Sequence, residues 1–363
     1  MNVLSLFDGM SCGRIALERA GIKVTNYFAS ELDKYAIKVT QANWPNTIQL
    51  GDVTKWREWD IDWSSIDLLI GGSPCQGFSF AGKQLAFDDP RSKLFFVYSD
   101  ILTHIDNERD KAGKSEVKFL LENVKMKKEY LEIISDHLGV KPVFINSALV
   151  SAQNRQRYYW ANWDFEQPED KGLVLRDIVE HSVDGKYQLS EKLLKGFESK
   201  INRRSEMKSG FDNFNVRPLG EKVSCLTARY YKIAMSDPFI EIRSASMVGR
   251  KIDENGKRND SLDKKAVQCL EVNSHGKSRC LSTVSKDSLV TDLPPGRHID
   301  YERKSYRKLT PIECERLQTV PDNYTNHVSN TQRYKMLGNG WTVDVIAHIF
   351  TPLAFSINCE RAA

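Results

Sequence analysis

Apolar runs alternate with amphipathic stretches over about the first 160 residues of the chain. The apolar runs, which are rich in β-branched and aromatic residues, predict strands at residues 3–7, 24–30, 66–70, 117–121 and 143–145. The stretches between them predict helices at residues 13–20, 34–42, 94–105 and 128–137. This alternation predicts a doubly wound α/β sheet, a fold that binds its ligands at the carboxyl ends of the strands.

The pattern changes between residue 172 and about residue 303, where the runs are short and loop signals such as Pro294-Pro295-Gly296 recur. We expect a separate, smaller β-rich domain there. Helical periodicity returns at Thr310-Pro311-Ile312-Glu313, which has the spacing of a capping box, and continues to about residue 350. We expect this last stretch to pack back on the first domain.

The middle of the chain is also more basic than the rest. Residues 171–305 hold 26 Lys and Arg against 19 Asp and Glu, a net charge of +7, whereas the remaining residues carry −3. This asymmetry is typical of a module that binds a polyanion, although a lysine-rich solvated surface explains it equally well. We therefore divide the chain at residues 1–170, 171–305 and 306–363.

Composition excludes several classes of protein. No apolar run approaches the roughly 20 residues of a membrane span, so we expect no contact with a membrane, and the amino-terminal residues do not resemble a secretory signal. The seven cysteines are scattered and form no C-x-x-C pair. This arrangement argues against a disulfide framework or a zinc site, and favours a metal-free protein of the reducing cytoplasm.

Candidate ligand-binding residues follow the first strands. The loop Phe7-Asp8-Gly9-Met10-Ser11-Cys12-Gly13 joins a strand to a helix, where free backbone N–H groups can meet a ligand. The dinucleotide fingerprint G-x-G-x-x-G is absent. Glu31 ends the second predicted strand and could accept both hydroxyls of a ribose, and Asp52 could accept from an adenine amino group. Each carboxylate alone is more typical of a helix cap, but together they outline a site for an adenosyl ligand.

A nucleophile is predicted at Cys75, in Gly71-Gly72-Ser73-Pro74-Cys75-Gln76-Gly77, which follows an apolar strand. A cysteine near a helix start or a positive charge can have a lowered pKa and act as a nucleophile, whereas an isolated cysteine is more often a small buried apolar residue. The flanking glycines, proline and polar residues favour the first interpretation.

Two further clusters carry polar side chains to the same edge of the predicted sheet. Glu122 ends an apolar strand, where partial burial would raise its pKa and let it donate a proton. Arg155 and Arg157 stand two residues apart, so an extended chain projects both from one face, which suits a planar carbonyl or a phosphate. A surface pair of ion-paired arginines is the alternative.

Taken together and in order, these motifs resemble the DNA cytosine-5 methyltransferase family over nearly the whole chain. The motifs are the loop at residues 7–13, Glu31, Asp52, Ser73-Pro74-Cys75-Gln76, Glu122-Asn123-Val124, Gln153-x-Arg155-x-Arg157, a variable stretch, Arg307-x-Leu309-Thr310-x-x-Glu313-x-x-Arg316-Leu317-Gln318, and Gly338-Asn339-Gly340-Trp341. The chain departs from the commonest bacterial pattern at Ser11, where glycine is usual, and at Gly340-Trp341, where Ser-Val is frequent. Both departures are similar to the animal de novo DNA methyltransferases, but the chain has no long amino-terminal reader region, so we expect a stand-alone bacterial or phage enzyme.

The resemblance implies a Rossmann-like mixed sheet with helices on both faces, at residues 1–170, and a smaller target-recognition domain at residues 171–305. It implies S-adenosylmethionine as cofactor and S-adenosylhomocysteine as product, with Phe7 against the adenine. The residues implied at the cofactor are Phe7, Asp8, Gly9, Met10, Ser11, Gly13, Glu31, Leu32, Asp52, Val53, Pro74, Leu94, Asn339 and Trp341.

The resemblance also implies methyl transfer to carbon 5 of a cytosine flipped out of duplex DNA. Cys75 would add to ring carbon 6, Glu122 would hold and protonate N3, Arg157 would bind the O2 carbonyl, and Arg155 would help fix the ring or the backbone. The residues expected near flanking DNA are Gln76, Ser79 and Arg91, in a loop that resembles the family's mobile catalytic loop. We expect a monomer associated with the nucleoid of a bacterial or phage-infected cell, and the sequence leaves open a paired restriction endonuclease.

Three other functions stay open at this point. A tRNA cytosine-5 methyltransferase would share the same catalytic motifs. A catalytically dead DNA-binding regulator would have lost the nucleophile or its acid, which this chain keeps. A Rossmann oxidoreductase would carry the dinucleotide fingerprint, which this chain lacks.

Overall fold

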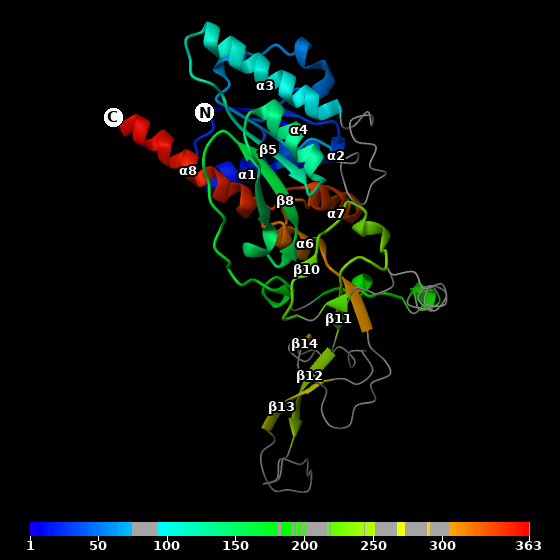
Figure 1. Ribbon diagram of the computed structural model, residues 1–363. Coiled ribbons are helices and arrows are strands. Elements are labelled where there is room, and N and C mark those ends of the chain that lie inside the picture. Colours follow the sequence, from blue (N-terminus) through cyan, green and yellow to red (C-terminus); the bar gives the residue numbers. More distant parts are fainter. Residues whose placement is uncertain are drawn as a thin grey trace. The chain divides into compact units, whose positions relative to one another are not determined.

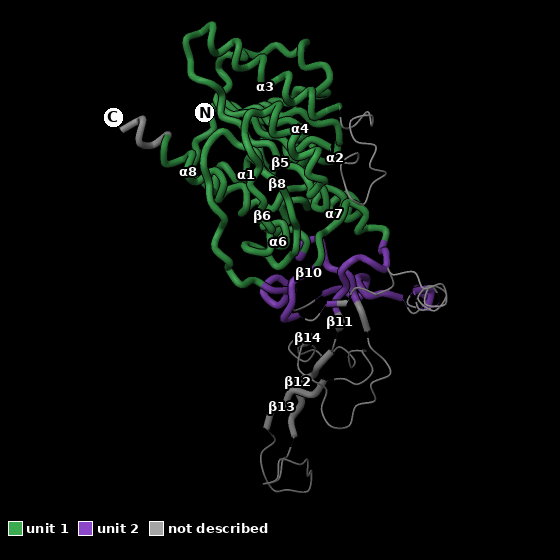
Figure 2. The backbone as a smooth tube through the Cα atoms, viewed as in Figure 1, with its two compact units in different colours: residues 1–173, 224–232, 314–363 green, residues 174–223, 233–313 purple. Residues whose placement is uncertain are grey.

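The computed structural model describes most of the chain in two compact units (Figure 2). Unit 1 comprises Met1–Leu173, Ser224–Lys232 and Cys314–Ala363, and unit 2 comprises Val174–Val223 and Ile233–Glu313. The described residues are 1–74, 93–180, 183–190, 192–193, 195–197, 199, 216–217, 219–242, 244–250, 267–272, 289–290 and 305–362. The segment Ser224–Lys232, inside the stretch expected to form the second domain, belongs to unit 1.

A mixed sheet of seven strands forms the centre of unit 1, in the order β3-β2-β1-β4-β5-β8-β6. Its strands β5 and β8 are labelled in Figure 1. Its strands are β1 (Asn2–Leu6), β2 (Asn26–Ser30), β3 (Ile48–Gln49), β4 (Leu68–Gly71), β5 (Lys118–Val124), β6 (Val143–Asn146) and β8 (Gln156–Ala161). The pairs from β3 to β5 are parallel, whereas β8 runs antiparallel to both of its neighbours. The carboxyl ends of β1, β2, β4 and β5 therefore share one edge.

Helices cover both faces of this sheet. They are α1 (Cys12–Arg19), α2 (Lys34–Asn43), α3 (Lys93–Lys111), α4 (Lys128–Leu138), α7 (Asn330–Asn339) and α8 (Val343–Ala362). In α6 (Pro311–Leu317), the residues up to Glu313 belong to unit 2 and those from Cys314 belong to unit 1. Alternate positions of β1 and β4, such as Leu4 and Leu69, enter a buried core with Phe95 and Tyr98 of α3. On the opposite face Ile70 packs against α1 at Gly13, and α1 packs on α8.

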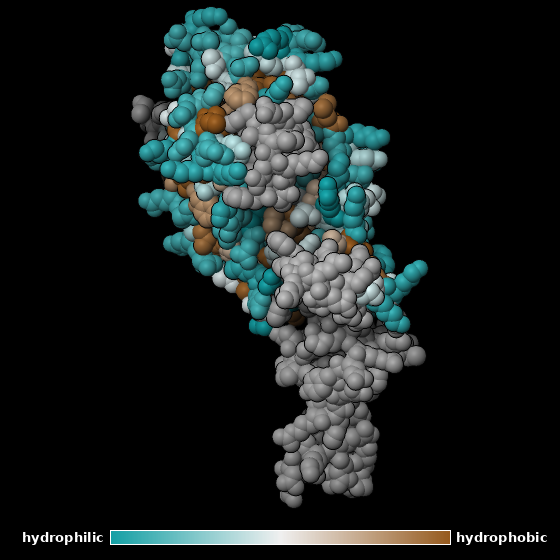
Figure 3. Space-filling view, turned by 45° about the vertical axis from the view of Figure 1, so that its right-hand side comes forward, coloured by the Kyte–Doolittle hydropathy of each residue, from teal (hydrophilic) through white to brown (hydrophobic). Residues whose placement is uncertain are grey.

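Short 3-10 turns join these elements, and two small pieces complete unit 1. The turns are η1 (Val53–Glu58), η2 (Trp63–Ser65), η4 (Ser147–Leu149) and η7 (Tyr230–Lys232), and β7 (Gln153–Asn154) precedes β8. Unit 1 is mostly hydrophilic on the face that Figure 3 shows, where hydrophobic residues form separate small patches. No helix in the described ranges is both long and apolar enough to cross a membrane.

Unit 2 is built from short strands and turns. β9 (Val216–Arg217), β11 (Phe239–Ile242) and β15 (Ser305–Lys308) form one sheet, and β12 (Ser244–Arg250), β13 (Val267–Val272) and β14 (Leu289–Val290) form another. Its turns are η5 (Leu175–Asp177) and η6 (Gly185–Tyr187), and β10 (Val223–Ser224) spans the junction with unit 1. The predicted capping box is confirmed, because the Glu313 amide donates to the Thr310 hydroxyl and the Thr310 amide donates to the Glu313 carboxylate.

The fold class predicted from the sequence is confirmed, and two strands of the sheet were not predicted. β3 has only two residues, too few to show a period. The residues of β8 were expected to be extended chain, but the direction of the strand was not predicted. The short link from β6 to β8 determines this direction. Only nine residues separate β6 from β8, and a parallel crossover needs a dozen or more, so β8 turns back antiparallel.

Candidate active site

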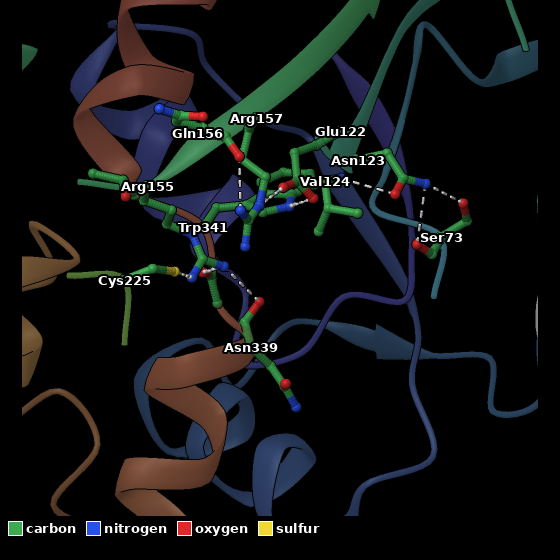
Figure 4. Close-up of polar contacts among 12 residues, drawn as sticks. Ser73, Glu122, Asn123, Val124, Arg155, Gln156, Arg157, Cys225, Asn339 and Trp341 are labelled. Carbon is green, nitrogen blue, oxygen red and sulfur yellow. Dashed lines mark hydrogen bonds and ion pairs between the residues drawn. The ribbon is translucent and has the colours of Figure 1, made fainter. Parts of the chain in front are cut away.

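A cavity of about 330 Å³ lies in unit 1 at the carboxyl ends of the parallel strands. Its walls come from the segments that follow these strands and from the turn after α7 (Figure 4). These segments carry Phe7, Glu31, Pro74, Glu122 and Trp341 to one place. The volume is that of a small-molecule site, and its position is where sheets of this kind bind ligands.

The loop after β1 has an unusual backbone. Phe7, Gly9 and Ser11 have positive φ angles of 56°, 60° and 61°. Glycine adopts this conformation without cost, whereas a side chain makes it unfavourable. The Ser11 hydroxyl offsets the cost, since it bonds to the Asp8 carboxylate and lies 2.9 Å from the Thr40 hydroxyl. Serine can therefore occupy this left-handed backbone position.

Asp8 is the centre of the hydroxyl network beneath this loop. Its carboxylate accepts from Ser5 Oγ at 2.6 Å and from Tyr27 Oη at 2.7 Å, besides the bond from Ser11. Burial nevertheless raises the pKa of the Asp8 carboxyl to about 6, because the loss of water outweighs these hydrogen bonds.

Replacement of this carboxyl is expected to change how stability depends on pH. Since the folded pKa of about 6 lies above the ordinary value of 3.8, Asp8 stabilises the fold below pH 3.8, and this contribution is lost as the pH rises through 6. Denaturant unfolding of the wild type and Asp8→Asn should therefore diverge by roughly 2–3 kcal/mol between pH 4 and pH 7. Burial also raises the pKa of Asp237 to about 6. Its contribution to the pH dependence is the same in both proteins, so it cancels when one curve is subtracted from the other. Parallel curves would show that Asp8 does not titrate in this range.

Glu31 is held by backbone amides at the end of β2. Its Oε2 accepts from the Gly9 amide at 2.8 Å, and its Oε1 accepts from the amides of Leu32 and Asp33 at 2.7 and 2.8 Å. These bonds fix the carboxylate against the glycine loop; Oε1 already accepts two amides, so the remaining acceptor capacity is on Oε2. Asp33 caps α2 and pairs with Lys335 of α7 at 2.7 Å, which ties the same corner to the carboxy-terminal helices.

Glu122 is the carboxylate at the other end of the cavity. It is 8% exposed, at the end of β5. Arg157 Nε lies 2.8 Å from its Oε1, and Trp341 Nε1 donates to its Oε2 at 3.1 Å (Figure 4). The next residue, Asn123, is buried and donates to the Ser73 hydroxyl at 3.1 Å, so the ends of β4 and β5 are joined beneath the carboxylate.

Arg155 makes different contacts from Arg157, although both line the cavity. It is 3% exposed, and its guanidinium donates to the carbonyls of Leu226, Gly338 and Gly340 at 3.4, 3.2 and 2.9 Å. It also donates to Cys225 Sγ at 3.2 Å. The side chain thus joins the segment Ser224–Lys232 to the turn that carries Trp341.

Gln153 extends the same connection and is a residue whose role the sequence did not indicate. It is fully buried, accepts from the Leu226 amide at 3.3 Å, and donates to the Leu317 carbonyl at 2.8 Å and to Gln318 Oε1 at 2.9 Å. Gln318 in turn donates to the Leu337 carbonyl at 2.6 Å. Glutamine suits this place because its amide donates and accepts at once.

The structure brings together most of the residues predicted for the site. Those that line the cavity are Phe7, Asp8, Gly9, Gly13, Glu31, Pro74, Glu122, Arg155, Arg157, Asn339 and Trp341. The described residues that line it do not include Met10, Ser11, Leu32, Asp52, Val53 and Leu94. Cys75, Gln76, Ser79 and Arg91 lie outside the described residues.

Asp52 shows why a carboxylate at a strand end is a weak signal by itself. It begins η1, and its Oδ1 accepts from the amide and hydroxyl of Thr54 at 2.9 and 2.8 Å. These bonds lower the pKa of Asp52, and they are the contacts of a helix-capping side chain. An adenine contact for Asp52 stays a prediction.

Sequence and structure comparisons agree with this geometry. The family model described as C-5 cytosine-specific DNA methylase matches residues 1–139 and 141–354. Type II methyltransferase M1.ScrFI of Lactococcus lactis subsp. cremoris is 31% identical, over 95% of this chain and 75% of its own. The orphan methyltransferase M.SPRI of Bacillus phage SPR is 27% identical, over 97% of both chains.

Solved structures show the same fold at low identity. A methyltransferase of Entamoeba histolytica, EhMeth, aligns with a TM-score of 0.62 at 17% identity, over 97% of this chain and 98% of its own. Spodoptera frugiperda DNMT2 aligns with a TM-score of 0.58 at 21% identity, over 98% and 99%. Likeness to the animal de novo subgroup stays a prediction.

The match of the family model over nearly the whole sequence shows that the chain belongs to the C-5 cytosine-specific DNA methylase family, and is a DNA cytosine-5 methyltransferase.

Proposed function

We propose that the protein methylates carbon 5 of a cytosine flipped out of a specific duplex DNA sequence, through a covalent adduct with Cys75. The observation that supports this most is the composition of the cavity. One end holds Glu31 against the glycine-containing loop, and the other holds Glu122 between Arg157 and Trp341. A carboxylate suited to an adenosyl ligand and a carboxylate suited to proton transfer thus line one cavity.

The residues at the first end fit S-adenosylmethionine, the methyl donor of this family. Phe7 offers an aromatic ring, the Glu31 carboxylate offers acceptors for ribose hydroxyls, and Asn339 and Trp341 form the wall opposite. The bound cofactor would supply an electrophilic methyl group at this place. Glu31 is already oriented by three backbone amides, so little ordering would be needed on binding.

The residues at the second end fit a cytosine. Glu122 would hold N3 and give it a proton, and Arg157 would bind the O2 carbonyl. Cys75 directly follows Ser73-Pro74, which line the cavity, and its thiolate would add to carbon 6. This addition makes carbon 5 nucleophilic, and after methylation the carbon-5 proton leaves and the cysteine is eliminated. A base inside a duplex cannot be reached, so it must be flipped out.

Binding to DNA is assigned to the basic stretch 171–305 and to Gln76, Ser79 and Arg91 near the flipped base. Lysine and arginine contacts to phosphates would supply affinity that falls with salt, and a few side chains would read base edges. Bisulfite sequencing of DNA from cells that express the protein would identify the methylated sequence. Once this sequence is known, an endonuclease from the same source that cuts it would be the paired restriction enzyme.

The covalent route is tested with a duplex that carries 5-fluorocytosine at the methylated position. Fluorine cannot leave as a proton does, so the enzyme should remain joined to the DNA as a species resistant to SDS. Cys75→Ala should abolish the adduct and methyl transfer while duplex affinity changes by less than about threefold, a small fraction of the interface free energy.

Cys225 provides the matched control because it is the described thiol most suited to compete. Burial raises the pKa of its thiol, but the Arg155 and Arg157 guanidiniums together lower the pKa by more than burial raises it. The net pKa is therefore below the ordinary value. By contrast, burial raises the pKa of the Cys12 thiol, which lines the cavity, to about 12. An adduct that persists in Cys75→Ala and disappears in Cys225→Ala would overturn our assignment of the nucleophile. Label found on tRNA and never on duplex DNA would overturn the substrate.

A further inference from the structure

The Trp341 indole spans the cavity between two glycines. At one end, a Cβ placed on Gly13 would lie 3.4 Å from the six-membered ring of the indole. At the other end, a Cβ placed on Gly72 would lie 3.0 Å from Trp341 Nε1 and 2.8 Å from Glu122 Oε2. A side chain at Gly72 would therefore push apart the indole nitrogen and the carboxylate. The ring reaches from the first turn of α1 to the end of β5.

This contact gives Glu122 two partners from different elements, an ion pair and a hydrogen-bond donor. Arg157 of β8 lies at Oε1, and the indole N–H of the turn after α7 donates to Oε2 (Figure 4). Partners on both oxygens, the Arg157 guanidinium at Oε1 and the indole N–H at Oε2, define the plane of the carboxylate, whereas one alone would leave it free to rotate. The turn is held in place by Arg155, which binds the carbonyl of Gly340.

We propose that Trp341 is a positioning residue, which couples the state of the cofactor cavity to the orientation of Glu122. The inference rests on the proposed function, in which Glu122 protonates cytosine N3. The same ring lines the cavity and holds the carboxylate, so a ligand packed against the ring sets the position of the N–H donor.

The other groups that face Glu122 do not replace this donor. Arg157 and Arg155 are the cations of this end of the cavity, and Tyr159 stands opposite Glu122 on β8. Burial raises the pKa of Tyr159, so it stays neutral through the working range. Asp8, Glu31 and Asp33 line other walls of the cavity. A hydrogen bond donated to an ionised carboxylate favours the ionised form, so removing the Trp341 donor should move the pH dependence of the reaction upward.

The test is Trp341→Phe, which keeps an aromatic ring and removes the donor. The matched control is Trp163→Phe, because Trp163 also donates one indole hydrogen bond, at 2.9 Å to the Ile349 carbonyl, and does not line the cavity. In Trp341→Phe, the pH profile of kcat for methyl transfer to the identified duplex should move up by about one pH unit, which is the scale of one charge-assisted hydrogen bond. The value of kcat should be about tenfold lower. Cofactor Kd should change less than about threefold, and the control should match the wild type.

Because phenylalanine leaves part of the indole volume empty, β-(3-benzothienyl)alanine at position 341 provides a second variant of the same shape without the N–H. Both variants should share the shifted profile. A profile that stays in place in the benzothienyl variant would overturn the inference and leave the proposed function intact. If the wild type itself forms no 5-fluorocytosine adduct and transfers no methyl group, the proposed function fails first, and this separates the two outcomes.

Discussion

Glu122→Gln is expected to lower kcat for methyl transfer by about 10³-fold, within the range of a lost general acid. The amide has the same shape and can still accept from the Trp341 indole, but it cannot give a proton to cytosine N3 and has no charge for Arg157. Single-turnover transfer of a labelled methyl group to the identified duplex measures the effect.

Glu129→Gln is the control, since Glu129 is an exposed carboxylate in the first turn of α4, shortly after β5. It should leave the rate unchanged. Duplex affinity should also stay close to that of the wild type in Glu122→Gln, which separates chemistry from binding. A Glu122→Gln enzyme with more than a tenth of the wild-type rate would show that another group protonates the base.

Arg155→Lys is expected to destabilise the protein by roughly 3 kcal/mol, because several buried carbonyls lose their donor. A lysine ammonium is a compact charge and cannot reproduce a planar fork that meets Leu226, Gly338 and Gly340 together. Since these contacts hold the turn of Trp341, cofactor affinity should fall about tenfold or more as the wall of the cavity loosens. Thermal unfolding should show a midpoint lower by about 5–10 °C.

Arg157→Lys provides the comparison within the same motif. Its guanidinium meets the Glu122 carboxylate at the cavity, so lysine there should reduce kcat by about 10²-fold, with the unfolding midpoint close to that of the wild type. Arg155→Lys should thus mainly lower the stability of the protein, and Arg157→Lys should mainly lower kcat. Equal losses of rate and unchanged midpoints in both variants would contradict this division.

The sequence predicted the outline of unit 1 because its signals are local. The strands that became β1, β2, β4, β5 and β6 are short apolar runs, and α1 to α4 show a helical period between them. The capping box at Thr310 and Glu313 is local as well, since its two residues stand only three positions apart.

Contacts between distant segments could not be predicted in this way. Arg155 and Arg157 look equivalent two residues apart, yet Arg155 binds carbonyls more than 180 residues away and Arg157 meets Glu122. The segment Ser224–Lys232 stands in the stretch expected for the second domain, but it packs in unit 1, where a Cβ on Gly338 would collide with the backbone of Thr227.

The sequence by itself determined the family, the order of the strands along the chain, and the residue types gathered at the ends of those strands. Only the tertiary structure decided which of these side chains meet. In the tertiary structure β8 runs antiparallel to β5, Arg155 donates to backbone carbonyls, and the Trp341 indole donates to Glu122. The physical reason is that periodicity reports which face of an element is buried, whereas a hydrogen bond depends on the position of a partner brought close by folding.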